Sequence, residues 1–289
     1  MATRKLGLAL GGGGVKGIAH LGVLAELEGL GVEVDVIAGT SIGAIVGALA
    51  AARVPLGVAE EAFRATPVRR LLGFDPERWG LIGAGKLADI LYGILGDRRI
   101  EELPIAYAAV AVDLVTGREV TLTRGSLVEA ALASAAVPGI FPPNRGGEQI
   151  LVDGGIRNNL PVDVARRLGA ERVIAVDLFG EFNAWGVTDP REAGFLSLRR
   201  WAPLTQLELA ERAINIMLHE MTVARLRETP PDLLISPEVH AISMAEIRLP
   251  DPGIEAGAAA VRPYLAELDA LRRWRLGEDP GLRDVAALG

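Results

Sequence analysis

One serine stands between two glycines in the segment Gly39-Thr40-Ser41-Ile42-Gly43. The pattern G-x-S-x-G is typical of a nucleophile elbow when an apolar strand precedes it and a helix follows it. Both conditions are expected here, because Val32 to Ala38 is predicted to be a strand and Ala44 to Arg53 a helix of small residues. Side chains two residues to either side of the serine would collide in so tight a turn, and Gly39 and Gly43 carry none. The segment therefore predicts a nucleophilic serine, Ser41.

A serine nucleophile needs a base, and the chain has only three histidines, His20, His219 and His240. His20 falls among the apolar residues of a predicted helix, where a packing role is expected. The pair His219-Glu220 lacks the second histidine of the zinc-binding pattern H-E-x-x-H. His240 could complete a Ser–Asp–His order, but its neighbours do not resemble a catalytic loop.

An aspartate is the better candidate for the base. Asp153 follows the predicted strand Gln149 to Val152 and is itself followed by Gly154-Gly155, which opens a turn. Ligands of α/β proteins bind beyond the carboxyl ends of parallel strands, which is where this carboxylate is expected. Asp177 also ends a predicted strand and is the rival candidate. Most such aspartates only cap the next element.

A third turn is rich in glycine, with four in succession from Gly11 to Gly14. Glycines let a strand–helix turn present its N–H groups to negative charge. Gly12, Gly14 and Gly17 also satisfy G-x-G-x-x-G, with Asp35 about 20 residues further on, so a dinucleotide-binding protein remains an alternative. That fingerprint places the acidic residue at the end of the second strand, whereas the apolar run here continues past Asp35.

Short apolar runs alternate with helical patterns along most of the chain, which indicates an α/β fold. We expect a mostly parallel central sheet with helices on both faces, in three layers, as a single domain over residues 1–289. The motif-bearing core spans about residues 5–177, and residues 178–289 supply a helical insertion and complete the core. Pro55 to Arg99 and Phe179 to Arg227 are expected to form amphipathic insertions.

Composition narrows the function further. Lysine and arginine total 30 against 37 aspartates and glutamates, which gives a net charge of -7. Because the basic residues form no dense cluster, we do not expect the protein to bind nucleic acid. The absence of cysteine excludes thiol catalysis and zinc–thiolate sites. We expect neither a metal nor another cofactor. The apolar segment Val36 to Ala52 is shorter than a membrane span and contains a turn. A cytoplasmic protein, with at most peripheral membrane contact, is expected.

Together these motifs resemble those of the patatin-like phospholipases. The resemblance is strong from Lys5 to Asp177 and looser beyond. Five segments carry it: Gly11 to Gly17, Gly39 to Gly43, Ala133 to Pro143, Asp153 to Gly155 and Asn158 to Val162.

The resemblance implies a Ser–Asp dyad without histidine. Ser41 would attack an ester carbonyl, and Asp153 would take its proton and later activate water. The N–H groups of Gly12, Gly13 and Gly14 would form the oxyanion hole. The implied substrates are lipid or other acyl esters, and a transacylase using the same dyad is an alternative. Insertion residues that could touch a membrane transiently are Leu71, Leu72, Phe74, Trp79, Phe195, Leu198 and Trp201.

Overall fold

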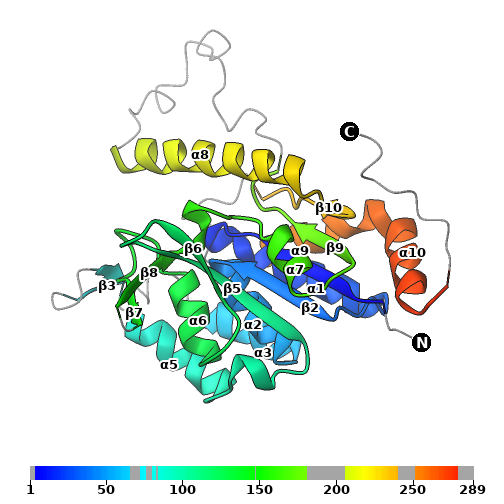
Figure 1. Cartoon of the computed structure of the whole chain (residues 1–289), viewed down its shortest axis with the longest axis horizontal. Helices are drawn as coiled ribbons and strands as arrows, with labels where there is room; N and C mark the ends of the chain where they lie inside the picture. The colour runs from blue at the N-terminus through cyan, green and yellow to red at the C-terminus, as the bar shows by residue number, and fades with distance from the viewer. Residues whose placement is uncertain are drawn as a thin grey trace, which may run out of the picture.

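A computed structural model of the chain describes residues 4–65, 72–75, 80–82, 84–146, 148–180, 206–239 and 251–278 (Figure 1). At its centre lies an eight-stranded sheet in the order β10-β9-β1-β2-β5-β8-β7, with β6 also paired to β5. Five neighbouring strands are parallel: β10 (Leu233–Ile235), β9 (Arg172–Val176), β1 (Leu6–Leu10), β2 (Val36–Thr40) and β5 (Ala106–Asp113). The expected α/β fold around a mostly parallel sheet is confirmed.

The other three strands of this sheet are antiparallel to their neighbours: β6 (Arg118–Leu122), β7 (Asn144–Gly146) and β8 (Gln149–Asp153). Only residues 114–117 separate β5 from β6, too few for the crossover that a parallel pair requires. The expectation that Asp153 ends a parallel strand was wrong, because β8 runs against β5. A separate hairpin pairs β3 (Leu72–Asp75) with β4 (Gly80–Ile82).

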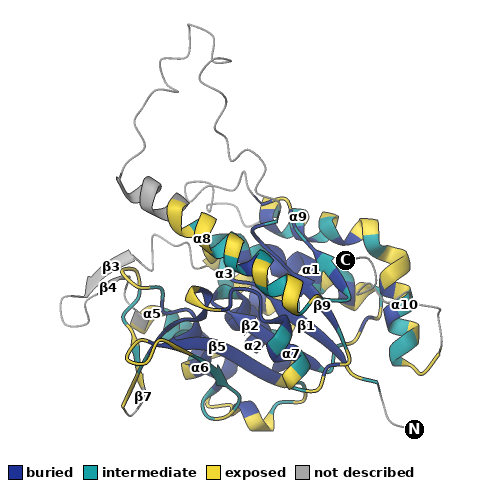
Figure 2. Cartoon of the chain, turned by 45° about the horizontal axis from the view of Figure 1, so that its top comes forward, coloured by how far each residue is buried: buried dark blue, intermediate teal, exposed yellow. Residues whose placement is uncertain are grey.

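Large aliphatic side chains fill one face of the sheet. Leu6, Leu8 and Leu10 of β1 are fully buried there in the main apolar cluster, together with Ile37 of β2 and Tyr107 of β5. The helices that supply side chains to this cluster are α1 (Ala19–Gly29), α2 (Ile42–Ala51), α3 (Leu56–Ala65), α5 (Ala84–Leu95), α6 (Leu127–Ser134), α9 (Asp251–Val261) and α10 (Leu265–Arg275). Figure 2 shows the buried sheet beneath exposed helix surfaces.

The opposite face carries smaller side chains, because alternate residues of a strand point to opposite sides of the sheet. Ala9, Ala38 and Ala108 are buried in a second cluster with residues of α7 (Val162–Arg167). Leu226 of the long helix α8 (Gln206–Glu228) packs on the same cluster. In Figure 1, α7 and α8 lie on the other side of the sheet from α2, α3, α5 and α6, so helices cover both faces as expected.

The predicted helix that contains His20 begins only after a short 3-10 turn. Residues Gly14–Ile18 form a 3-10 turn, and α1 begins at Ala19. Helix α9 then packs closely on α1, since a Cβ at Gly22 would lie 1.9 Å from the carbonyl oxygen of Ile254. None of the described helices has both the length and the apolar character needed to cross a bilayer.

Candidate active site

Ser41 stands at the junction of β2 and α2 in a backbone conformation that serine rarely adopts, with φ 56° and ψ -125°. Strain of this kind costs about 1–3 kcal/mol and is concentrated at functional sites. The flanking glycines permit the turn: a Cβ at Gly39 would lie 2.4 Å from the carbonyl oxygen of Gly43, and one at Gly43 would lie 2.2 Å from that of Leu10. The fold therefore leaves no room for a side chain at Gly39 or Gly43, as the sequence argument predicted.

Strand registers bring Ser41 and Asp153 to the same level of the sheet. Thr40 of β2 is paired with Val110 of β5, and the next residue of β5, Ala111, is paired with Asp153 of β8. Ser41 and Asp153 thus flank β5 at one height, one on each side. This juxtaposition depends on the antiparallel course of β8, which the sequence pattern did not indicate.

The Asp153 carboxylate is buried, with 6% of the residue exposed. Its Oδ1 accepts a hydrogen bond of 2.7 Å from the Gly155 N–H, whereas its buried Oδ2 has no hydrogen-bond partner. Burial raises the pKa of Asp153 to about 6, against smaller lowering effects of the Ser41 side chain and the Gly155 N–H. No hydrogen bond joins the Ser41 hydroxyl to the Asp153 carboxylate in this structure, a looseness that is common before substrate binds.

A second serine, Ser134 at the end of α6, supports the nucleophile turn. Its hydroxyl oxygen accepts a 2.9 Å hydrogen bond from the Ser41 N–H, and the same hydroxyl donates a 2.5 Å hydrogen bond to the carbonyl oxygen of Val110. Sequence reasoning gave Ser134 no role, although it lies in one of the segments that carry the family resemblance. A lone hydroxyl between alanines carries little signal in the sequence.

The glycine-rich turn lies beside the serine: a Cβ at Gly12 would be 3.1 Å from Ser41 Cβ. The Gly12 N–H already donates to the carbonyl oxygen of Asn159 at 3.0 Å. Within the described residues, no hydrogen bond engages the N–H groups of Gly13 and Gly14. Only two of the three expected oxyanion donors are therefore unengaged in this structure.

His20 takes part in this turn through packing and one hydrogen bond. Its fully buried ring donates from Nε2 to the carbonyl oxygen of Gly11 at 2.8 Å. Burial lowers the pKa of His20 to about 4, so the ring stays neutral at physiological pH. The buried ring therefore supports the glycine turn through its hydrogen bond to Gly11, in keeping with the expected packing role.

The other candidates from the sequence lie elsewhere or have other partners. An Asp177 carboxylate oxygen accepts the N–H of Phe179, so this residue caps its own turn. Asp35 precedes β2, at the end of the sheet opposite the glycine turn, and pairs with Arg275 and the Leu6 N–H. The dinucleotide alternative thus loses its acidic residue. His219 lies on α8.

Several expected residues fall outside the described part of the chain. They are His240 and, among the insertion residues, Leu71, Trp79, Phe195, Leu198 and Trp201. Within the described part, no group of three or more His, Asp or Glu side chains is arranged to hold a metal ion.

Helix α8 approaches the Asp153 turn, because Leu218 Cδ2 lies 3.8 Å from the position of a Cβ at Gly155. Apolar side chains are exposed in this neighbourhood. The segments that adjoin Asp153 and Leu218 carry the exposed residues Ile140, Ile156, Ile214 and Met217. The Ala136 carbonyl, four residues before Ile140 in the chain, accepts the Asp153 N–H at 3.0 Å.

Comparison with known proteins gives a consistent result. A family model described as patatin-like phospholipase matches residues 8–166. An uncharacterised NTE-family protein of Mycobacterium tuberculosis is 35% identical over 286 residues, which covers 94% of this chain and 48% of that protein. Patatin-like phospholipase domain-containing protein 7 of Mus musculus is 35% identical over 222 residues, covering 69% of this chain and 16% of that protein.

Among solved structures, VipD from Legionella pneumophila superposes with a TM-score of 0.59 at 14% identity, over 92% of this chain and 67% of that one. This chain spans about half the length of the mycobacterial relative. Since the family model covers more than half of the chain, including Ser41 and Asp153, the chain belongs to the patatin-like phospholipase family.

Proposed function

We propose that the protein is a serine-dependent lipid acyl hydrolase of the esterase or phospholipase A type. The observation that carries the proposal is a strained, buried serine beside a buried carboxylate whose Oδ2 has no hydrogen-bond partner. A carboxylate with a pKa near 6 is mostly ionised at pH 7 and is a better base than an exposed aspartate. The proposed nucleophile is Ser41 and the proposed base is Asp153.

The reaction proceeds in two steps through an acyl-enzyme. The Ser41 oxygen bonds to the ester carbonyl carbon while Asp153 takes the serine proton. The carbon–oxygen bond to the alcohol then breaks, and Asp153 returns the proton to the leaving alcohol. In the second step Asp153 takes a proton from water, whose oxygen attacks the acyl carbon, and the carboxylic acid leaves as Ser41 regains its proton.

The negative oxygen of each tetrahedral intermediate needs hydrogen-bond donors. We assign this role to the N–H groups of Gly13 and Gly14, which donate no hydrogen bond within the described part of the chain. Gly12 is assigned a steric role, because its missing side chain leaves room for Ser41 Cβ and for the Asn159 amide. One oxyanion donor is typically worth about 3 kcal/mol of transition-state stabilisation.

A lipid substrate is supported by the family and by the exposed apolar side chains near the site. Met217 and Ile214 of α8 are 64% and 55% exposed. Scattered apolar residues are common on protein surfaces, so the lipid contact needs its own test. Met217→Glu is expected to lower the fraction of protein that floats with zwitterionic phospholipid vesicles, with unchanged hydrolysis of a soluble short-chain ester. Equal flotation of both proteins would remove this surface from the proposal.

The nucleophile can be tested with a fluorophosphonate probe read by intact mass. Wild type should gain one adduct, and Ser41→Ala should gain none. Ser126→Ala is the matched control, since the Ser126 hydroxyl caps α6 by accepting the Glu129 N–H. It should label like wild type. Labelling that survives in Ser41→Ala, or no labelling of folded wild type, would overturn the assignment of Ser41.

The base can be tested by Asp153→Asn, which keeps the size of the side chain and its bond from the Gly155 N–H. General-base catalysis typically contributes 10²- to 10⁴-fold, so kcat should fall by about 10³-fold. Asp177→Asn, the variant of the rival aspartate, should keep most of its activity. A larger loss in Asp177→Asn than in Asp153→Asn would reverse the assignment.

A further inference from the structure

The backbone of Asn158 connects the two turns that carry Ser41 and Asp153. Its N–H donates to the carbonyl oxygen of Gly154, next to Asp153, at 2.9 Å. Its carbonyl oxygen accepts the hydroxyl proton of Thr40, next to Ser41, at 2.7 Å. One residue, fully buried, is therefore hydrogen-bonded to the neighbour of each proposed catalytic group.

The following residue extends this connection to the glycine turn. The carbonyl oxygen of Asn159 accepts the Gly12 N–H at 3.0 Å, and its side-chain amide lies 3.5 Å from the Gly12 carbonyl oxygen. Asn159 is 3% exposed. The dipeptide Asn158-Asn159 thus makes contact with all three turns of the site.

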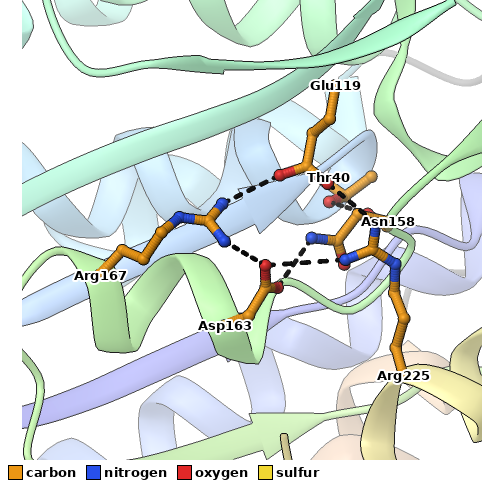
Figure 3. A network of polar contacts seen from close by, with 6 residues as sticks. All are labelled: Thr40, Glu119, Asn158, Asp163, Arg167 and Arg225. Carbon is orange, nitrogen blue, oxygen red and sulfur yellow. Dashed lines mark hydrogen bonds and ion pairs between the residues drawn. The ribbon is translucent and has the colours of Figure 1, made fainter. Parts of the chain in front are cut away.

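The side chain of Asn158 anchors this dipeptide to a charged network, drawn in Figure 3. Its Nδ2 donates to Asp163 Oδ1 at 2.8 Å. The other carboxylate oxygen of Asp163 accepts from Arg167 and lies 3.6 Å from Arg225 Nη1. Glu119 pairs with the same two arginines, at 3.0 Å and 3.1 Å.

This network draws on elements that are far apart in the sequence. Glu119 comes from β6, Asp163 and Arg167 from α7, and Arg225 from α8. Each arginine bridges the same two carboxylates, so Asp163 is held from two sides. A fixed Asp163 in turn fixes the orientation of the Asn158 amide.

We propose that Asn158 is a positioning residue that sets the distance between Ser41 and Asp153, with Asp163 and its arginines as its anchor. The proposal rests on the function proposed above for these two groups. A displacement of about 1 Å in a catalytic constellation can cost about 10²-fold in rate. Asn158 itself touches neither substrate nor reacting atoms in this arrangement.

The bond from Thr40 to Asn158 can be tested with two substitutions at one position. Thr40→Val removes the hydroxyl and keeps the shape, whereas Thr40→Ser keeps the hydroxyl. We expect Thr40→Val to lower kcat at least tenfold with KM within twofold of wild type. Thr40→Ser should retain at least a third of the wild-type kcat.

The pH profile separates positioning from general damage. If Ser41 moves away from Asp153, the carboxyl loses an interaction that lowers its pKa. The acid limb of the kcat/KM profile should then move to higher pH in Thr40→Val and stay in place in Thr40→Ser. Equal kcat values and coincident acid limbs in the two variants would overturn the proposal.

A second test needs no catalytic activity. Asn158→Leu removes the bond to Asp163, and hydrogen–deuterium exchange of the full chain should rise together in peptides covering residues 11–14, 39–43 and 153–159. Asn144→Leu is the matched control, because Asn144 also donates its amide to a carboxylate, that of Glu129, at 2.9 Å. The control should leave all three peptides at wild-type exchange.

The exchange result decides the proposal even where the ester hydrolysis fails. A wild type without serine labelling would refute the proposed function, while the joint rise in exchange would still support Asn158 as the connection between the turns. Faster exchange only in residues 153–159, with the other two peptides unchanged, would refute the connection whatever the activity.

Discussion

Replacing Asp153 by asparagine should stabilise the folded protein at neutral pH while it removes the proposed base. The wild-type carboxylate is buried and accepts only one hydrogen bond, so keeping it ionised in the fold is unfavourable. Asparagine keeps the oxygen that accepts the Gly155 N–H and carries no charge. Catalytic groups held in unfavourable surroundings commonly reduce stability in this way.

The size and sign of the effect follow from the pKa of Asp153. That pKa rises from 3.8 to about 6 on folding. Between these values the folded state binds more protons than the unfolded state, so stability falls as pH rises through this window. A pKa shift of about two units corresponds to about 3 kcal/mol of destabilisation of the folded state. This destabilisation is fully present above pH 6 and absent below about pH 4. For a chain of this length, this difference in stability corresponds to about 5 °C in Tm.

Thermal unfolding of wild type and Asp153→Asn at pH 4 and at pH 7.5 tests this reasoning. The stability of the variant relative to wild type should increase by about 3 kcal/mol between the two pH values. The pH dependence of wild type alone would not reveal the effect of Asp153, because His20 changes the stability in the opposite direction over the same pH range. Its pKa falls from 6.5 to about 4 on folding, so it contributes stability that is lost as pH drops through that range.

Asp113→Asn provides the control of opposite sign. Hydrogen bonds, chiefly from the Thr116 hydroxyl, lower the pKa of Asp113, so its charge stabilises the fold above the unfolded pKa. This variant should be less stable than wild type at pH 7.5, and the difference in stability should shrink as the pH falls. If the Tm difference between Asp153→Asn and wild type is the same at both pH values, the argument that burial raises the pKa of the Asp153 carboxyl is refuted.

Two further outcomes follow from the packing around the site. His20→Gln should be less stable than wild type by at least about 1 kcal/mol at pH 7, through weakening of the bond to the Gly11 carbonyl, and the difference should shrink as pH falls toward 4 in denaturant titrations. A constant difference across that range would contradict a neutral buried ring. Gly43→Ala should cost about 3 kcal/mol or more, because its Cβ would lie 2.2 Å from the Leu10 carbonyl oxygen. Gly93→Ala, on an exposed helix position with open space around it, should instead gain about 0.5–1 kcal/mol, and similar Tm values for both glycine variants would refute the steric reading.

The sequence alone was sufficient for the local features of this protein. Apolar runs between glycine turns predicted the strands, since burial on both faces demands continuous hydrophobic segments. The motif around Ser41 predicted a strand–turn–helix, because only glycine fits at positions 39 and 43 of such a turn. These features depend on a few consecutive residues, so a local pattern is enough to reveal them.

The spatial arrangement of the site depended on contacts between distant segments. The sequence marked Asp153 as a candidate, but only the antiparallel pairing of β8 with β5 brings it level with Ser41. Ser134 and Asn158 gained their roles in the same way, through hydrogen bonds to residues 93 and 118 positions away. Such bonds leave no periodic signal in the chain, because each joins two positions whose proximity is created by the packing of the whole sheet.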